Sequence, residues 1–473
     1  MNGGLVAALA LYAAGLLALG LRPAGGLAGL DAFFLAGRGL GAWRVAFSLT
    51  ASWVGAASLL VSTDEAYSGG LSAVWIIGVP AVATLLVLLP LSGRIRAQAG
   101  RTLGEMTEAA YGRPARAVTS FLIVWYMAVL AASQMVALGA LFKAFLGASR
   151  MVGILLAAAL VFLYSGAGGL VAVARTHVLQ FFLLIAGVAA LLASLLGRVQ
   201  AGAVGRAAAA AGKVDYFYIF DGFSSKWLIA LSFVLAWTVS PIAWQRMQAA
   251  RSGRAARTGL AGAALCLGLF YAGVTAAGTL MLPALDAATV EGPVISAYVI
   301  RFGAPFLLYA VFLSLTAAIM STLDAAVNAG AFSLAADVLR LGLFSESRPG
   351  RAALGPVTTM VIVVGASAVA MRFEGILRTL GLAAKLMAEG LFIPGMASLF
   401  LKRRSPLAGT LSLLAGGGFA LCGFLQEAGL LNAGLPVWPY SLLPGVGLSA
   451  AAFLAGFLLD KRRKQGAGNL STC

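Results

Sequence analysis

Apolar runs long enough to cross a lipid bilayer recur thirteen times along this 473-residue chain. A helix of about 20 apolar residues matches the hydrocarbon thickness of a membrane. Because lipid offers no hydrogen-bond partners, a spanning segment must pair its backbone groups internally, as a helix does. The sequence therefore predicts an all-α polytopic membrane protein with about 13 transmembrane helices. The runs cover approximately residues 4–21, 43–62, 71–92, 117–142, 151–170, 176–197, 227–244, 259–284, 303–330, 354–371, 379–401, 407–425 and 441–459.

The composition agrees with this class and excludes several others. Hydrophobic residues make up 61% of the chain, charged residues 10%, and the mean hydropathy is +0.96. The three cysteines, Cys266, Cys422 and Cys473, lack the paired spacing of a disulfide framework or a metal cluster. The sequence has no nucleotide-binding glycine loop, no zinc-protease motif and a single histidine. We therefore predict that the protein is not an enzyme.

The formal net charge of +17 would suggest a nucleic-acid partner if the protein were soluble. Here most lysines and arginines fall in every second loop, on one side of the predicted membrane. Cytoplasmic loops carry such an excess, so we predict an outside N-terminus and a cytoplasmic C-terminus in the cell inner or plasma membrane. Residues 1–4 are not basic, so the first run is interpreted as a span and not a signal peptide. The basic loops would attract anionic membrane lipid, and no nucleic-acid partner is predicted.

Two of the predicted spans contain residues that interrupt a helix. The second span has a small and polar run around Gly55, and the seventh contains Pro241, which removes a backbone donor. Each of these spans opens a block of five, and an odd number of spans inverts the second block relative to the first. Interrupted helices in this arrangement indicate a midplane binding site in a secondary transporter, although ordinary kinks would use the same residues.

Polar residues in the ninth predicted span indicate an ion site. Ala318, Ser321 and Thr322 share one helix face in an otherwise apolar segment. Their hydroxyl groups, with a carbonyl that a Ser or Thr side chain loosens, suit a hard cation such as Na⁺. The alternative is that these hydroxyls only join two membrane helices.

Four motifs, in order along the chain, resemble the sodium:solute symporter family over residues 32–410. They are FLAGRGLG at residues 34–41, YSGAGGLVAVARTHVLQ at 164–180, WQRMQAA at 244–250 and AAIMSTLD at 317–324. The family is similar to the leucine-transporter architecture, which has a five-plus-five inverted repeat with broken helices. The resemblance implies a first span and inner loop over residues 1–42 and a transporter core over 43–402. The core repeats would cover about 43–197 and 227–402, and residues 403–473 would form two further spans and a basic cytoplasmic tail.

The resemblance also implies which atoms bind the coupling ion, Na⁺. The family holds one Na⁺ between the spans that correspond here to spans two and nine. The matching groups are the carbonyls of Ala51, Val54 and Ala318 and the hydroxyls of Ser321 and Thr322. Asp324 lies on the flank of this face, and we expect it to pair with an arginine of an inner loop.

One position departs from the family pattern. The family segment usually reads Thr-Asp-x-x-Gln, whereas this chain has Thr176, His177 and Gln180. Family members with a second sodium site use that Asp, so its absence implies one Na⁺ per cycle. We expect His177 to be a solvated or interfacial side chain near the cytoplasmic mouth; the alternative is a group that titrates near neutral pH.

The solute site is expected at the midplane, between the broken spans and spans four and eleven. Lys385 and Glu389 lie four residues apart on one face of span eleven. Either they pair with each other or Lys385 meets a substrate carboxylate. The second possibility slightly favours small organic acids or amino acids over neutral sugars. The candidate solute-binding residues are Trp53, Ser58, Gln134, Trp237, Thr238, Lys385 and Glu389.

Together these features predict a sodium-coupled secondary active symporter that imports a small organic solute by alternating access. One alternative is a proton-coupled permease of the same fold, with His177 or Asp324 carrying the proton. Another is a transporter-like membrane sensor. The predicted partners are the small-molecule solute and membrane lipid, and no oligomeric state is predicted.

Overall fold

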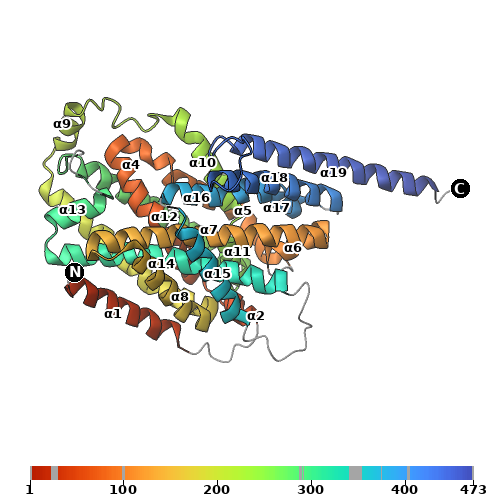
Figure 1. Ribbon diagram of the computed structural model, residues 1–473, viewed down its shortest axis with the longest axis horizontal. Helices are drawn as coiled ribbons and strands as arrows, with labels where there is room; N and C mark the ends of the chain where they lie inside the picture. Colours follow the sequence, from red (N-terminus) through yellow and green to blue (C-terminus); the bar gives the residue numbers. More distant parts are fainter. Residues whose placement is uncertain are drawn as a thin grey trace.

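The computed structural model describes residues 3–22, 30–98, 102–286, 290, 292–339, 354–373, 375–401 and 405–470, and every regular element in these ranges is a helix. The predicted all-α class is therefore confirmed. Figure 1 shows one elongated bundle in which most long helices run roughly along its long axis. The elements are α1 (Gly3–Gly20), α2 (Leu30–Leu35), η1 (Ala36–Arg38), α3 (Ala42–Trp53), η2 (Ala57–Val61), α4 (Ser62–Gly69), η3 (Gly70–Trp75), α5 (Gly78–Ala97), α6 (Leu103–Tyr111), α7 (Arg113–Leu146), α8 (Arg150–Arg198), α9 (Ala203–Ala210), α10 (Phe223–Thr238), α11 (Pro241–Ala249), α12 (Gly253–Met281), α13 (Val294–Phe302), α14 (Pro305–Ser333), η5 (Leu334–Val338), α15 (Leu354–Ala370), α16 (Ile376–Lys385), η8 (Leu386–Leu391), α17 (Phe392–Phe400), α18 (Pro406–Glu427) and α19 (Leu442–Leu470).

Within these described ranges, nine helical stretches are long and apolar enough to cross a membrane, and two shorter apolar helices cover Arg150–Gly166 and Leu354–Ala370. The shorter helix Arg150–Gly166 is the first half of α8, which turns at Gly169 (φ 55°). The two remaining predicted spans, residues 43–62 and 379–401, are helices interrupted along their length by irregular or π-helical turns. The exact number of spans therefore stays a prediction.

The interruption in the second predicted span follows from Val54 and Gly55. The α3 helix ends at Trp53 because Val54 has left the helical conformation (φ −90°, ψ 82°). A Cβ at Gly55 would lie 2.7 Å from Oε1 of Gln134 and 2.8 Å from Oγ1 of Thr322. Only glycine lets α3 approach α7 and α14 this closely.

The interruption in the seventh predicted span has a different cause. The α10 helix ends at Thr238, and α11 starts at Pro241, whose missing N–H is not needed in the first turn of a helix. The Trp244 indole donates to the carbonyl of Thr238 across this break at 2.8 Å. The break is therefore closed by a side chain and not left with an unpaired carbonyl.

At the centre of the bundle, α14 packs against α7, α8, α15 and α3. Nearly all of its residues from Val311 to Ser333 are buried. Such a helix, surrounded on all sides, can present polar groups to neighbours without exposing them to lipid. The ion-binding face predicted from the sequence lies on this helix.

A short connector, residues 36–41, precedes α3 and links its start to the end of α11. Residues Ala36, Gly37 and Arg38 all have positive φ (49°, 60° and 57°) and form a left-handed turn between α2 and α3. The amide of Leu40 then donates to the carbonyl of Ala249 at 3.0 Å, and the amide of Arg251 donates to the carbonyl of Leu40 at 2.9 Å. The start of α3 is thus fastened to the end of α11.

The two chain ends lie at opposite ends of the bundle. The α1 helix starts at the end that carries α9 and α13, and α19 projects beyond the bundle at the other end (Figure 1). An odd number of crossings, such as the thirteen predicted from the sequence, would give this arrangement. Lys461 and Arg462 of the predicted basic tail continue α19 as helix. The orientation in the membrane and the domain and repeat boundaries stay predictions, and the boundary at residue 402 lies outside the described residues.

Candidate functional site

Four oxygen atoms gather where α14 faces the break in α3. The Ser321 hydroxyl donates to the carbonyl of Ala51 at 2.8 Å and lies 2.9 Å from the carbonyl oxygen of Ala318. The Thr322 hydroxyl lies 3.4 Å from the same Ala318 oxygen. These four groups are named the oxygen cluster below. The fifth predicted residue, Val54, is fully buried at the break and adjoins Gly55, beside Thr322.

The composition of the oxygen cluster fits a small hard cation. Hard cations hold oxygen ligands at about 2.4 Å, so two oxygens that share one ion lie about 3 to 3.5 Å apart. The separations in the cluster, 2.8 to 3.4 Å, approach this spacing. Among the described residues, no group of three or more His, Cys, Asp or Glu side chains gathers that could hold a metal ion. The neutral oxygens of α3 and α14 are therefore the candidate ligands, and their lack of formal charge suits a monovalent ion.

A pocket adjoins the oxygen cluster and shares Thr322 with it. Its volume is about 40 Å³, and we name it the central pocket. Its walls are the two interrupted helices (α3 with η2, and α10 with α11) together with α7 and α16. None of the described residues that line it is charged. They are Ser52, Trp53, Gly55, Ala57, Ser58, Ile77, Tyr126, Leu130, Gln134, Trp237, Ser240, Ile242, Thr322 and Leu380.

Four of the seven predicted solute-binding residues line the central pocket: Trp53, Ser58, Gln134 and Trp237. Thr238 is not among the described lining residues, and its hydroxyl donates to the carbonyl of Val234 at 2.7 Å, within its own helix. This backward hydrogen bond is common for Thr in membrane helices. The Thr238 backbone carbonyl accepts the Trp244 indole, so the residue holds the helix break and does not line the described pocket.

Lys385 and Glu389 lie outside the described lining of the central pocket, on the side of α16 and η8 that faces α18 and α19. The Lys385 ammonium is fully buried, 4.0 Å from Oε1 of Glu427 and 5.8 Å from the centre of the Phe419 ring. Glu389 accepts a hydrogen bond of 2.8 Å from Ser441. Both charges therefore join the core of the bundle to its two C-terminal helices.

Two aromatic rings form one wall of the central pocket. The Trp53 and Trp237 rings lie 5.7 Å apart at 44°, and Phe233 stacks on Trp237 at 4.8 Å and 15°. The Gln134 amide oxygen accepts the backbone N–H of Ala56 at 2.9 Å. This bond fixes the second half of the interrupted helix relative to α7.

Several lining residues were missed by the sequence analysis, although a signal for some of them exists. Tyr126 and Leu130 precede Gln134 by eight and four residues, so all three lie on one face of α7. Helical spacing from Gln134 would have identified both. Ser52 and Ser240 lie in the interrupted stretches that were recognised, but nothing in the sequence shows that their side chains face inward.

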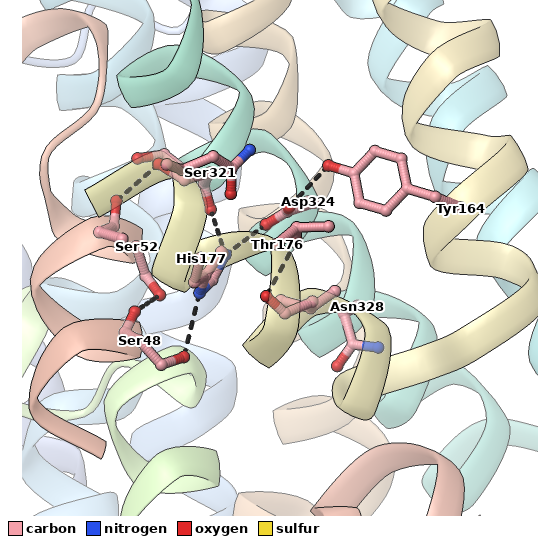
Figure 2. Close-up of polar contacts among 12 residues, drawn as sticks. Ser48, Ser52, Tyr164, Thr176, His177, Ser321, Asp324 and Asn328 are labelled. Carbon is pink, nitrogen blue, oxygen red and sulfur yellow. Dashed lines mark hydrogen bonds and ion pairs between the residues drawn. The ribbon is translucent and has the colours of Figure 1, made fainter. Parts of the chain in front are cut away.

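His177 is the clearest correction to the sequence analysis. Its side chain is fully buried and not solvated or interfacial as expected. The ring Nε2 lies 2.7 Å from Oδ1 of Asp324 and 3.1 Å from the carbonyl of Ser321, while Nδ1 lies 3.0 Å from the Ser48 hydroxyl. Figure 2 shows the ring of His177, from α8, between residues of α3 and α14. His177 therefore lies directly behind the oxygen cluster.

Asp324 also differs from its expected role. Its two carboxylate oxygens contact His177 and the Tyr164 hydroxyl, the latter at 2.6 Å (Figure 2). No arginine of the described residues forms an ion pair with it, and its ion-pair partner there is His177. A buried carboxylate is stable only when its oxygens are hydrogen-bonded, and a histidine and a tyrosine provide this here.

Interrupted helices that meet at a buried pocket beside neutral oxygens are typical of a secondary active transporter. The sequence model of the sodium:solute symporter family matches residues 33–413, most of the chain, and the chain belongs to that family. Membership in this family makes the protein an integral membrane transporter and not an enzyme, with Na⁺ as its coupling ion.

Sequence and structure comparisons with individual proteins also match transporters. The chain is 30% identical over 173 residues to the high-affinity choline transporter 1 of Caenorhabditis elegans, a match that covers 34% of this chain and 28% of that protein. A Na⁺-coupled sialic acid symporter, solved in a substrate-bound outward-open state, has a similar fold over 97% of both chains, with a TM-score of 0.80 and 18% identity. MhsT in complex with L-phenylalanine aligns with a TM-score of 0.50 and 16% identity over 88% of this chain and 97% of that one. These similarities confirm the leucine-transporter-type fold.

Proposed function

We propose that the protein imports a small organic solute together with one Na⁺ by alternating access, with the solute in the central pocket. In this proposal Na⁺ is held by the oxygen cluster, with the Val54 carbonyl as a fifth ligand. The observation that carries the proposal is the position of Thr322. Its side chain belongs to the oxygen cluster and lines the central pocket, so the ion and the solute would share one wall.

The contacts around Gly55 connect the proposed ion site to the helix segment that lines the central pocket. Gly55 touches both Thr322 and Gln134, and Gln134 accepts the N–H of Ala56. An ion that draws the α3 carbonyls towards α14 therefore also sets the position of the helix segment that lines the pocket. Na⁺ binding would order the solute site, which is a positive coupling between two ligands.

One Na⁺ per cycle is energetically sufficient. One charge that crosses about 100 mV yields about 2.3 kcal/mol, and a tenfold Na⁺ gradient adds about 1.4 kcal/mol. The sum, about 3.7 kcal/mol, corresponds to solute accumulation of several hundredfold. The replacement of an acidic residue by His177 supports the single ion, because the imidazole occupies this buried position.

For the solute, we propose a small molecule without net negative charge. The expectation of an organic acid depended on Lys385, and this side chain contacts Glu427 and Phe419 outside the pocket lining. A solute whose only charge is a carboxylate would lack a cationic partner in an uncharged pocket, and its desolvation is costly, whereas a zwitterion carries its own cation. The faces of Trp53 and Trp237 instead suit a zwitterionic amino acid or a quaternary ammonium group, and choline is the solute in the name of one relative.

Thr322→Ala tests the ion site. The variant removes one of about five neutral oxygens, so the Na⁺ concentration for half-maximal uptake should rise about tenfold if that oxygen contributes about 1.4 kcal/mol. The matched control is Thr322→Ser, which keeps the oxygen and should stay near wild type. Uptake that ignores Na⁺ and follows an imposed pH gradient would contradict the proposal and favour a proton-coupled permease.

A thermal-shift series on the purified protein tests the solute class. Solutes of similar size are compared with and without Na⁺: choline, a zwitterionic amino acid and a monocarboxylic acid. We expect Na⁺-dependent stabilisation by choline or the amino acid, because ligands of the folded state raise the melting temperature. Stabilisation by the carboxylic acid alone would contradict the solute class but leave the ion site standing.

A further inference from the structure

A second cavity, much larger than the central pocket, lies beside the connector that precedes α3. Its volume is about 540 Å³, and its walls come from α1, η1, α3 and α8. None of its described lining residues also lines the central pocket. Because three of them are arginines, Arg22, Arg44 and Arg175, we name it the arginine cavity.

The charged side chains that line the described part of the arginine cavity are all positive. No acidic side chain is among its described lining residues. The Arg175 guanidinium donates to the carbonyl of Arg22 at 2.8 Å, which fixes it at the wall. Arg22 and Arg44 are exposed, and neither side chain forms an ion pair within the described part of the chain. Arginines with free donors bind phosphate in bidentate geometry.

The rest of the wall is apolar and continues towards the membrane interior. Leu19, Leu40, Val171 and Val178 line the cavity with the arginines. One helical turn further along α3 and α8 lie Phe47, three residues after Arg44, and Phe182, four residues after Val178, with ring centres 6.2 Å apart.

Exposed aromatic rings flank this apolar wall. The Trp43 side chain is 74% exposed, and exposed Trp rings mark the border between headgroups and hydrocarbon; the Phe182 side chain is 58% exposed and, being wholly apolar, fits the hydrocarbon. Because Phe182 and Trp43 both face outward there, an acyl chain can lie along the apolar wall while a headgroup sits at the arginines.

We propose that the arginine cavity binds an anionic phospholipid. Arg22 and Arg44 hold its phosphate, and an acyl chain lies along the apolar wall towards Phe47 and Phe182. Basic pockets between membrane helices bind lipid headgroups of this kind. A free phosphate offers the same chemistry to the arginines but gains nothing from the apolar continuation, which is why we assign the lipid.

The location of the cavity gives the bound lipid a role. Ala36, Gly39 and Leu40 of the connector form part of its wall. Leu40 is hydrogen-bonded to Ala249 and Arg251 at the end of α11. A lipid in the cavity therefore stabilises the segment that fastens the two interrupted helices together, and its binding should raise the stability of the whole protein.

The test uses the full-length protein in a neutral detergent. Thermal unfolding and native mass spectrometry are measured while phosphatidylglycerol, phosphatidylcholine, glycerol 3-phosphate or inorganic phosphate is added. We expect phosphatidylglycerol alone to raise the melting temperature and to remain bound. In Arg22→Gln/Arg44→Gln the phosphatidylglycerol concentration for half-maximal stabilisation should rise at least tenfold. The matched control is Arg254→Gln/Arg257→Gln, which removes two exposed charges from the start of α12 and should behave as wild type.

Two results would overturn the proposal. Equal stabilisation of the wild type and both double variants by phosphatidylglycerol would show that the arginine cavity is not the site. Stabilisation by glycerol 3-phosphate or inorganic phosphate at the same concentration as by the lipid would show that the ligand is a soluble phosphate. If the double variant does not fold, Arg44→Gln alone replaces it, because Arg44 is exposed on the first turn of α3, and a threefold loss is then expected.

Discussion

At the scale of single residues, Gly55 has little freedom to change. The space where a side chain would go is already filled by Gln134 on one side and Thr322 on the other, at 2.7 and 2.8 Å. Both neighbours are buried and hydrogen-bonded, so neither has room to move aside. A methyl group here would push α3 away from the two helices that hold the proposed ion and solute.

Gly55→Ala should therefore abolish uptake or raise the Na⁺ requirement more than Thr322→Ala does. A clash of this kind typically costs about 1–3 kcal/mol. The matched control is Gly418→Ala in α18, where a Cβ meets nothing within 4 Å. Uptake kinetics at several Na⁺ concentrations measure the effect. Wild-type uptake by Gly55→Ala would show that the α3 break does not form the proposed site.

His177 and Asp324 form the second residue-scale prediction. His177→Ala leaves one oxygen of a fully buried carboxylate without its partner, which should cost about 1–3 kcal/mol of unfolding free energy. In a double-mutant cycle, His177→Ala with Asp324→Asn should cost less than the two single changes together. The melting temperatures of the four proteins give the coupling. Additive effects would mean that the two side chains do not support each other.

At the scale of elements, the sequence predicted which residues share a helix face, but not which neighbouring helix that face contacts. Spacing along span nine placed Ala318, Ser321 and Thr322 on one face, and the structure brings that face to the α3 break. The same reasoning put Lys385 and Glu389 on one face of span eleven, but it did not reveal which neighbour that face meets. That depends on α18 and α19, whose packing brings in Glu427 and Ser441 from later in the chain.

The position of His177 shows the same limit. A lone histidine near a loop has no periodic pattern around it, and its burial depends on α3, α8 and α14 meeting at one point. The partners that stabilise it, Ser48 and Asp324, lie 129 and 147 residues away in the sequence. Long-range polar pairs of this kind leave no local signal.

Lys385→Met should separate packing from solute recognition at the element scale. Because Lys385 lies outside the described lining of the central pocket, we expect the variant to keep its solute and Na⁺ affinity. Its stability should fall, since Glu427 and Glu389 then remain buried without the cation. Adding Glu427→Gln should restore part of the melting temperature. Loss of solute binding with unchanged stability would place Lys385 at the solute after all.

At the scale of the whole molecule, the two ends of the bundle can be assigned to the two sides of the membrane. Val214 is 91% exposed between α9 and α10, at the end predicted to be outside. In a background with Cys266, Cys422 and Cys473 changed to Ser, Val214→Cys should react with an impermeant thiol reagent in intact cells. Arg254→Cys, at the other end, should react only after the membrane is permeabilised. The opposite pattern would reverse the orientation.

The hydrogen bonds of Leu40 to Ala249 and Arg251 bear on how tightly Na⁺ transport is coupled to solute transport. A symporter leaks when one of its moving helices changes position and the other does not, because the ion is then released without the solute. Here two backbone hydrogen bonds through Leu40 link the start of α3 to the end of α11, so neither helix can swing outward alone without breaking them. We expect a low Na⁺ current in the absence of solute. A futile cycle that dissipates the Na⁺ gradient should appear only when the two hydrogen bonds of Leu40 are broken.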